Sequence, residues 1–92
     1  MAKFRLTIKE AVSGDVVKEV EFDEQIQADA KNRFFDILLE EAANQADGEY
    51  TGELSRWMPA KEQWDEVGAP VISCDVKDGK SALTVRRAVF SE

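Results

Sequence analysis

The most regular pattern of apolar positions lies between residues 25 and 46. Its apolar side chains recur every four residues, at Ile26, Ala30, Phe34, Leu38, Ala42 and Ala46. Residues with this spacing share one side of an α-helix, and no Gly or Pro interrupts the run. We therefore expect a helix over residues 24–47 that Asp23 or Asp29 caps at its start and that Gly48 follows as the C′ residue. The apolar side of this helix is broad and needs a sheet or a partner to cover it.

Before the helix, apolar and polar residues alternate and predict a β-hairpin over residues 3–23. Ser13-Gly14-Asp15 is the turn signal. A three-residue loop at these positions pairs Val12 with Val16, Ile8 with Val20 and Leu6 with Phe22. On this register the apolar side chains share one face and the charged side chains share the other. The charged face is either a docking surface or, as we expect, a solvated face with cross-strand ion pairs.

Residues 48–68 show no clear period. Two glycines interrupt regular structure, and Pro59 suits the first turn of a helix. We expect a loop over residues 48–58, with one helical turn inside it, and a short helix over residues 59–67 that residues 68–70 end. A loop of this length is uncommon in so small a domain, which indicates either a functional segment or a structure that the pattern hides.

Residues 71–90 predict a second hairpin, because Asp78-Gly79 is a strong signal for a type I′ turn. With these two residues at the tip, Val76 pairs with Ser81, Cys74 with Leu83 and Ile72 with Val85. Cys74 then lies on the inward face as an inert core residue rather than a reactive thiol.

Together these elements predict a single α+β domain over residues 1–92. The expected order is β-β-α-(short α)-β-β, which makes a roughly four-stranded antiparallel sheet with one long and one short helix packed on one face. The pattern leaves the strand order open.

Composition excludes several classes of function. The chain of 92 residues has no His, a single Cys and a net charge of −7. Without His there is no Ser-His-Asp triad and hardly any zinc, copper or non-haem iron site, so we expect no metal and no cofactor. The negative charge disfavours direct binding to nucleic acid or to an anionic membrane. One Cys excludes an internal disulfide and, together with an N-terminus that lacks a secretory signal, favours a cytoplasmic protein.

The negative charge is concentrated in one part of the chain. Residues 40–66 contain two basic and eight acidic side chains, a net charge of −6, and both tryptophans. Acidic and aromatic side chains together are typical of a surface that binds a basic partner. The candidate binding residues are Glu40, Glu41, Asp47, Glu49, Tyr50, Glu53, Trp57, Glu62, Trp64, Asp65 and Glu66. The alternative is that the tryptophans complete the core and the acidic residues only solvate the segment.

These observations favour a non-enzymatic, acidic module that docks on a basic surface of a partner protein and inhibits or regulates it, the partner being a nucleic-acid-binding protein. In size and charge alone the chain is comparable to anti-restriction and anti-CRISPR proteins. The alternative is an assembly subunit that self-associates through an apolar helix face or a sheet edge. An enzyme is disfavoured because the chain has no catalytic motif, and a small-ligand domain would need a pocket that the pattern cannot show.

Other candidate chemistry is weaker. Asp47-Gly48-Glu49 and residues 75–78 lack the spacing of a calcium loop. The adjacent carboxylates Glu40/Glu41 and Asp65/Glu66 do not converge if they lie on helices, because neighbouring helical residues point in different directions. Arg86-Arg87 is too small a basic cluster to indicate nucleic-acid binding.

Overall fold

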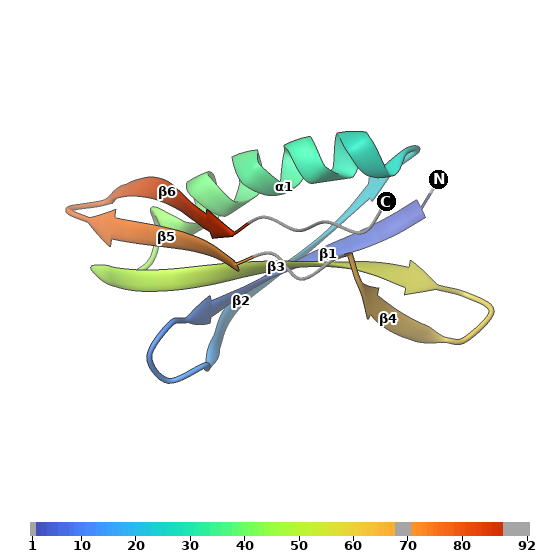
Figure 1. Ribbon diagram of the computed structural model, residues 1–92, viewed down its shortest axis with the longest axis horizontal. Coiled ribbons are helices and arrows are strands. Elements are labelled where there is room, and N and C mark those ends of the chain that lie inside the picture. Colours follow the sequence, from blue (N-terminus) through green and yellow to red (C-terminus); the bar gives the residue numbers. More distant parts are fainter. Residues whose placement is uncertain (1, 68–70, 88–92) are drawn as a thin grey trace.

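The described residues of the protein form an antiparallel sheet of six strands that one helix covers on one face. The computed structural model describes residues 2–67 and 71–87. In chain order the elements are β1 (Ala2–Glu10), β2 (Val16–Glu24), α1 (Gln27–Ala42), β3 (Gly48–Met58), β4 (Gln63–Glu66), β5 (Val71–Lys77) and β6 (Lys80–Arg87). The α+β class is confirmed, but the sheet is larger than expected, and one helix rather than two lies within the described ranges (Figure 1).

The strand order shows how the hairpins are joined. Neighbouring strands follow the order β2-β1-β3-β5-β6, and β4 pairs with β3. One edge of β3 pairs with β1, and its other edge pairs with β5 over residues 48–51 and with β4 over residues 55–58. The β1–β2 turn and the β3–β4 turn lie at opposite ends of the sheet, on the side away from α1 (Figure 1).

The first hairpin is confirmed, but its register differs from the expected one by two residues. Phe4 pairs with Phe22 and Leu6 with Val20, and the register shifts between Ile8 and Lys9. The observed register stacks the Phe4 and Phe22 rings with their centroids 5.9 Å apart, whereas the expected register would place Phe4 opposite an acidic residue. A shift of two residues keeps the side chains before the bulge on the expected faces. Beyond the bulge the expectation is wrong, because Val16 pairs with Lys9 on the charged face rather than with Val12 on the apolar face.

The helix is shorter than the expected span at both ends. Ile26 is the N-cap residue and makes no side-chain cap hydrogen bond, so neither Asp23 nor Asp29 caps the helix as we expected. The chain leaves the helix after Ala42 through a turn, and Gly48 is the first residue of β3 rather than the C′ residue. The start of the helix is instead tied to β2 by Arg33.

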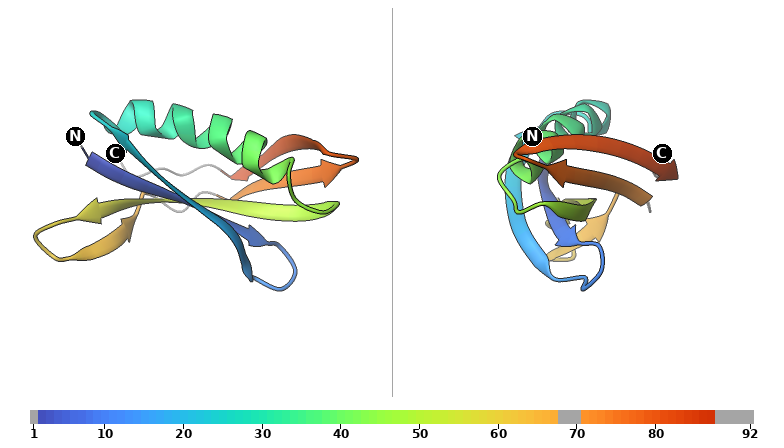
Figure 2. Two further views of the ribbon diagram at one scale, coloured as in Figure 1. Left: turned by 180° about the vertical axis from the view of Figure 1, so that it is seen from behind. Right: turned by 90° about the vertical axis from the view of Figure 1, so that its left-hand side faces the viewer.

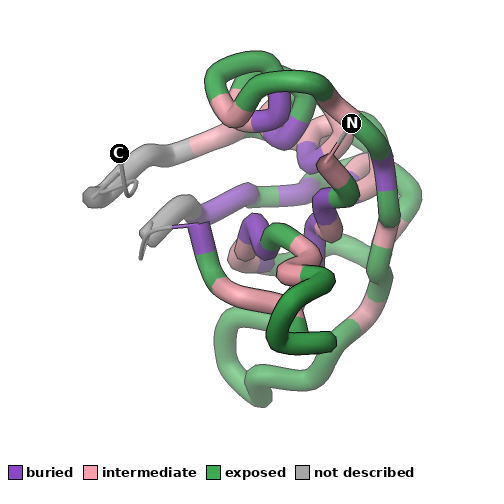
Figure 3. Tube along the Cα trace, turned by 90° about the vertical axis from the view of Figure 1, so that its right-hand side faces the viewer, coloured by how far each residue is buried: buried purple, intermediate pink, exposed green. Residues whose placement is uncertain are grey.

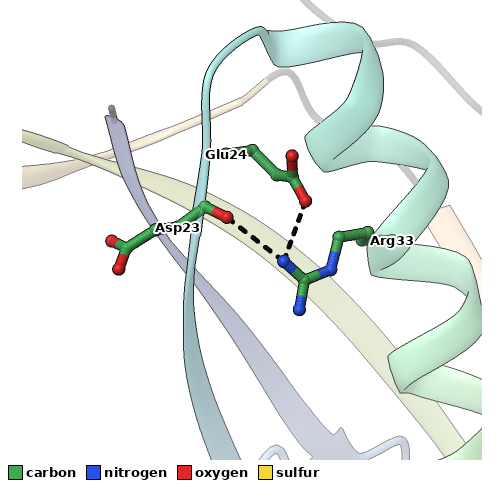
Figure 4. Close-up of polar contacts among 3 residues, drawn as sticks. All are labelled: Asp23, Glu24 and Arg33. Carbon is green, nitrogen blue, oxygen red and sulfur yellow. Dashed lines mark hydrogen bonds and ion pairs between the residues drawn. The ribbon is translucent and has the colours of Figure 1, made fainter.

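Arg33 ties α1 to the end of β2. Its Nη1 donates to the Glu24 carboxylate at 2.8 Å and to the carbonyl oxygen of Asp23 at 3.1 Å (Figure 4). The guanidinium also lies over the Phe22 ring at 5.1 Å from its centroid. In the same view the Asp23 carboxylate points away from the helix (Figure 4).

The expected loop at 48–58 is wrong, because these residues form β3, a strand in the interior of the sheet with neighbours on both edges. Gly52, which we interpreted as a break, lies inside this strand where α1 comes closest. A Cβ at this position would lie 2.7 Å from Cδ2 of Leu38 and 3.2 Å from Cζ of Phe34. The glycine thus allows a close approach of helix and sheet, which is a common use of glycine in a strand.

The expected helix at 59–67 is also wrong. Residues 59–62 form a turn in which the N–H groups of Lys61 and Glu62 donate to the carbonyl oxygens of Met58 and Pro59. The chain then returns as β4 and pairs with the end of β3. Pro59 suits this turn as well as it suits a first helical turn, since both need the same φ. The expected break at 68–70 lies outside the described residues.

The second hairpin is confirmed with the expected register. Cys74 pairs with Leu83, and the pairs on either side of it also match. Asp78 and Gly79 have φ angles of 52° and 76°, as a type I′ turn requires. The end of the expected hairpin, residues 88–90, lies outside the described residues, as do the side chains of Arg86-Arg87.

The core lies between α1 and the face of the sheet that the helix covers (Figure 2). Buried residues from both layers alternate along the chain with exposed ones (Figure 3). The core is formed by Phe4, Leu6, Ile8, Phe22, Ala30, Phe34, Leu38, Ala42, Tyr50, Leu54, Val67, Cys74 and Val76. The sheet therefore covers the apolar side of the helix, as its two adjacent phenylalanines required.

Candidate functional site

The face of the sheet opposite to α1 is the candidate site, and we call it the open face. Its side chains come from alternate residues of the strands, so each strand contributes one set to the core and the other set to this face. The open face contains Lys3, Arg5, Thr7, Lys9, Val16, Glu19, Glu21, Asp23, Glu49, Thr51, Glu53, Ser55, Trp57, Trp64, Glu66, Ser73 and Asp75.

Three large side chains cluster at the end of the open face where β4 pairs with β3. Trp57 and Trp64 lie opposite each other, with ring centroids 5.4 Å apart and an interplanar angle of 61°. The Arg5 guanidinium lies over the Trp64 ring at 4.5 Å from its centroid. Both tryptophans are half-buried and neither belongs to the core, and Trp57 also lines a pocket of about 400 Å³ at the end of the sheet. The pair therefore leaves aromatic surface accessible to a partner.

Next to this cluster the open face contains a polar pocket of about 330 Å³, which we call the open-face pocket. Thr7 and Ser55 line it although they are only 6% and 8% exposed. Within the described part of the chain, neither hydroxyl has a hydrogen-bond partner. Arg5 also lines the pocket, and its Nε is buried without a partner among the same residues. Buried polar groups are normally hydrogen-bonded, so the Arg5 Nε marks a place where water or a ligand completes the contacts, and the two hydroxyls beside it are free to bond the same water or ligand.

The charges of the open face are only partly paired. Lys9 contacts the Glu53 carboxylate at 3.1 Å, and Lys3 lies 3.8 Å from that of Glu21. The open-face carboxylates without an ion pair among the described residues are those of Glu19, Asp23, Glu66 and Asp75. All four side chains are exposed, so they are available to cations in solution.

The structure brings five of the sequence-predicted site residues together on the open face. Glu49 and Glu53 come from β3, where Glu53 is the partner of Lys9. Trp57, Trp64 and Glu66 come from the paired ends of β3 and β4. Five of the eleven predicted residues therefore share one continuous surface.

The other predicted site residues do not join this surface. Tyr50 points into the core, where its hydroxyl donates to the carbonyl oxygen of Ala46 at 2.6 Å. Glu40 and Glu41 lie on α1, and Glu41 faces Lys18 at 3.9 Å. The expected surface that joins the acidic end of the helix to the tryptophans is thus divided between two faces.

The remaining three predicted site residues, Asp47, Glu62 and Asp65, lie in turns or in β4. Asp47 accepts a hydrogen bond from the backbone N–H of Asp78 at 2.9 Å, which fixes the start of β3 beside the β5–β6 turn. Glu62 lies in the β3–β4 turn with a φ of 52°. Asp65 and Glu66 are neighbours on a strand, so their side chains point to opposite faces and cannot act as a catalytic pair.

Sequence reasoning missed Arg5, Thr7, Glu19 and Ser55, which line the open-face pocket. A signal for three of them was present in the hairpin pattern, because alternation already placed Arg5, Thr7 and Glu19 on the charged face. The signal for Ser55 was hidden, because it depends on recognising β3 as a strand. Only the pairing of β3 with β1 and β4 then shows that residues far apart in the chain share one pocket.

Two ionisable groups are shifted by their surroundings. Burial raises the pKa of the Cys74 thiol, and the neighbouring Asp75 carboxylate acts in the same direction. Cys74 is completely buried on the core side, as expected. A hydrogen bond from Gln63 Nε2 at 2.6 Å lowers the pKa of Asp65, and Lys61 contributes to the same shift. Neither group lies on the open face.

The described residues contain no group of three or more Cys, Asp or Glu side chains that is placed to hold a metal ion. In the same residues we find no helix with the length and apolar character needed to cross a lipid bilayer.

Comparisons with known proteins yielded no match to this chain, whether with protein-family models, with curated proteins or with solved structures. The function is therefore inferred from the geometry of the open face.

Proposed function

We propose that the protein is a non-enzymatic binding module whose open face docks on a basic surface of a partner protein. The observation that carries the proposal is the Trp57–Trp64 pair, which is half-buried and keeps part of its aromatic surface accessible on the open face beside unpaired carboxylates. Tryptophan is enriched among the residues that dominate binding energy in protein interfaces, because it offers a large and stiff contact area. A pair that served only the fold would be expected to lie under α1 with the other aromatic residues.

Charge supports a basic partner. Four open-face carboxylates have no cation within the described residues, and the whole chain has a net charge of −7. Such a surface attracts a cationic partner over several ångströms and accelerates the encounter, an effect that salt weakens. Carboxylates can also occupy positions that a basic surface provides for phosphates. A nucleic-acid-binding protein is therefore the partner class that fits best, and blocking its site is the expected consequence.

The proposal is tested by capturing a partner with two baits, the intact protein and a charge-reversed variant. Each bait is used at low and at moderate salt. Asp23→Lys with Asp75→Lys reverses two exposed open-face carboxylates that make no side-chain ion pair in the described residues. We expect the wild type to capture a basic protein at low salt, with less at moderate salt, and the variant to capture much less. The measurement is the amount of that protein retained from a host lysate.

A matched control reverses the same number of charges on the other side of the molecule. Asp36→Lys with Glu40→Lys changes two exposed residues of α1. Because the total charge of the two variants is equal, only the open-face variant should lose the partner. Equal loss in both variants would show that only the net charge of the protein matters and not its position. Full capture by the open-face variant would contradict the proposal.

The alternative of an assembly subunit has less support from the geometry. The apolar side of α1 packs on the sheet, and the large apolar side chains that remain exposed among the described residues are Val12, Val16 and Ile26. Val12, which is 93% exposed, lies in the β1–β2 turn, and Val16 is the first residue of β2. Neither belongs to a helix face that copies of the chain could share. Sedimentation over a range of concentrations decides between the two: a constant monomer mass argues against assembly.

A further inference from the structure

The open-face pocket combines groups that one kind of ligand can satisfy together. Glu19, from β2, and Glu66, from β4, line the pocket and have no ion pair within the described residues. Between them lie Thr7 and Ser55, two residues that are each more than nine-tenths buried and whose hydroxyls have no hydrogen-bond partner in the same residues. The pocket therefore offers two carboxylates at its ends and hydrogen-bonding groups between them.

The balance of charge in the pocket favours a cationic ligand. Lys9 and Glu53 also line it, but they neutralise each other in an ion pair of 3.1 Å. The two remaining carboxylates outnumber the one remaining cation, Arg5, whose guanidinium is already stacked on Trp64. An anion would meet two unpaired carboxylates in the same pocket, whereas a ligand with two cationic groups can approach both.

The spacing of the two carboxylates indicates an extended ligand. Glu19 lies opposite Thr7 on β1, and Glu66 lies opposite Ser55 on β3, so that two further strands separate them. Neighbouring strands are about 4.8 Å apart, which places the two backbone positions roughly 15 Å from each other along the sheet. A single side chain cannot span this distance, but an extended peptide of about five residues can, since each residue adds about 3.4 Å.

We infer that the open-face pocket binds an extended segment of the partner with two basic residues about four positions apart. The basic side chains pair with Glu19 and Glu66, while the peptide groups between them hydrogen-bond to the Thr7 and Ser55 hydroxyls and to Arg5. Trp64 forms the apolar wall beside this path. The inference rests on the proposed docking of the open face and specifies which chemistry of the partner it recognises.

The test is a titration of the labelled protein with short synthetic peptides, followed by the backbone amide signals in NMR spectra. The probe is acetyl-Lys-Gly-Ser-Gly-Lys-amide, and the matched controls carry Gln or Glu in place of both Lys residues. We expect the lysine peptide to shift the amide signals of β1, β3 and β4 around the pocket, and the two controls to shift them far less. Stronger binding of the Glu peptide, or equal binding of all three, would overturn the inference.

Variants locate the binding site. Glu19→Gln with Glu66→Gln removes both carboxylates from exposed positions, and its affinity for the lysine peptide should fall at least about tenfold. Such a loss is expected when a charged contact loses its partner. Asp36→Asn with Glu40→Gln on α1 removes the same charge and should keep the affinity of the wild type. An unchanged affinity in the open-face variant, or shifts concentrated on α1, would show that the peptide binds elsewhere.

Failure of the inference is distinguishable from failure of the proposed function. No shift with millimolar lysine peptide overturns the assignment of the pocket. Docking of the open face would nevertheless stand if Asp23→Lys with Asp75→Lys still abolished capture of a partner, because neither residue lines the pocket.

Discussion

On β1, Leu6 and Ile8 face the helix and are fully buried, whereas Thr7 between them faces the opposite way and lines the open-face pocket. Thr7 is nevertheless only 6% exposed. Its cover is not a second layer of structure but the long side chains of its neighbours on the open face. Neighbouring residues of one strand are thus buried in different ways, by apolar packing on the helix side and by polar side chains on the open face.

Because of this difference, we expect changes on the helix side to affect stability and changes on the open face to affect binding. Apolar contacts under the helix are complete within the chain, so changes there should alter the free energy of unfolding. The open face holds hydroxyls without partners and carboxylates without cations, so changes there should alter binding and leave folding nearly unaffected. If the two faces are independent, a substitution on one of them should leave the property that depends on the other unchanged.

The largest effect is expected for Leu38→Ala, on the covered side. Leu38 is fully buried against the sheet. Its truncation removes apolar contacts and leaves a cavity, which should cost about 2–5 kcal/mol of unfolding free energy. Urea unfolding followed by circular dichroism measures this loss. A cost below about 1 kcal/mol would mean that the helix packs on the sheet more loosely than the structure shows.

A smaller effect is expected for Gly52→Ala, where β3 passes under the helix. The new Cβ would come 2.7 Å from Cδ2 of Leu38, so the leucine or the helix must shift. Overpacking of this kind costs about 1–3 kcal/mol. Combining Gly52→Ala with Leu38→Ala supplies the control, because the smaller residue removes the atoms that clash. The double variant should therefore lose less stability than the sum of the two single variants.

Gly52 also explains why β3 was not predicted from the sequence. A glycine in an otherwise alternating stretch indicates either a break or a close approach, and the neighbouring residues do not distinguish the two. The deciding contact is with Leu38 and Phe34 of α1, which is a tertiary contact. By contrast, the Asp78-Gly79 hairpin was predicted with its register, because its turn geometry is set by adjacent residues.

The candidate site was only partly predicted, for a related reason. Charge counted along the chain identified the acidic segment but not the direction of its side chains, and direction depends on the strand. Glu49 and Tyr50 are neighbours, yet Glu49 faces the open side and Tyr50 is in the core. Glu19 lies in a different part of the chain and reaches the same pocket only through strand pairing.

The smallest effect on stability is expected for Thr7→Val, which replaces the hydroxyl with a methyl group of similar size. Because the hydroxyl has no hydrogen-bond partner in the described residues, its loss should change the unfolding free energy by less than about 1 kcal/mol, toward greater stability. Thermal unfolding measures the change. The same substitution should lower the affinity for the lysine peptide in the NMR titration, because it removes one of the hydrogen-bonding groups between the two carboxylates.

The adjacent residue provides the control. Ile8→Thr places a hydroxyl at a fully buried position on the helix side, where it meets only apolar groups of the core. This should cost about 2–4 kcal/mol, from the lost apolar contacts and the unsatisfied hydroxyl together. If Thr7→Val were as destabilising as Ile8→Thr, the Thr7 hydroxyl would have a role in the fold. The open face would then be a second structural layer rather than a surface that a partner completes.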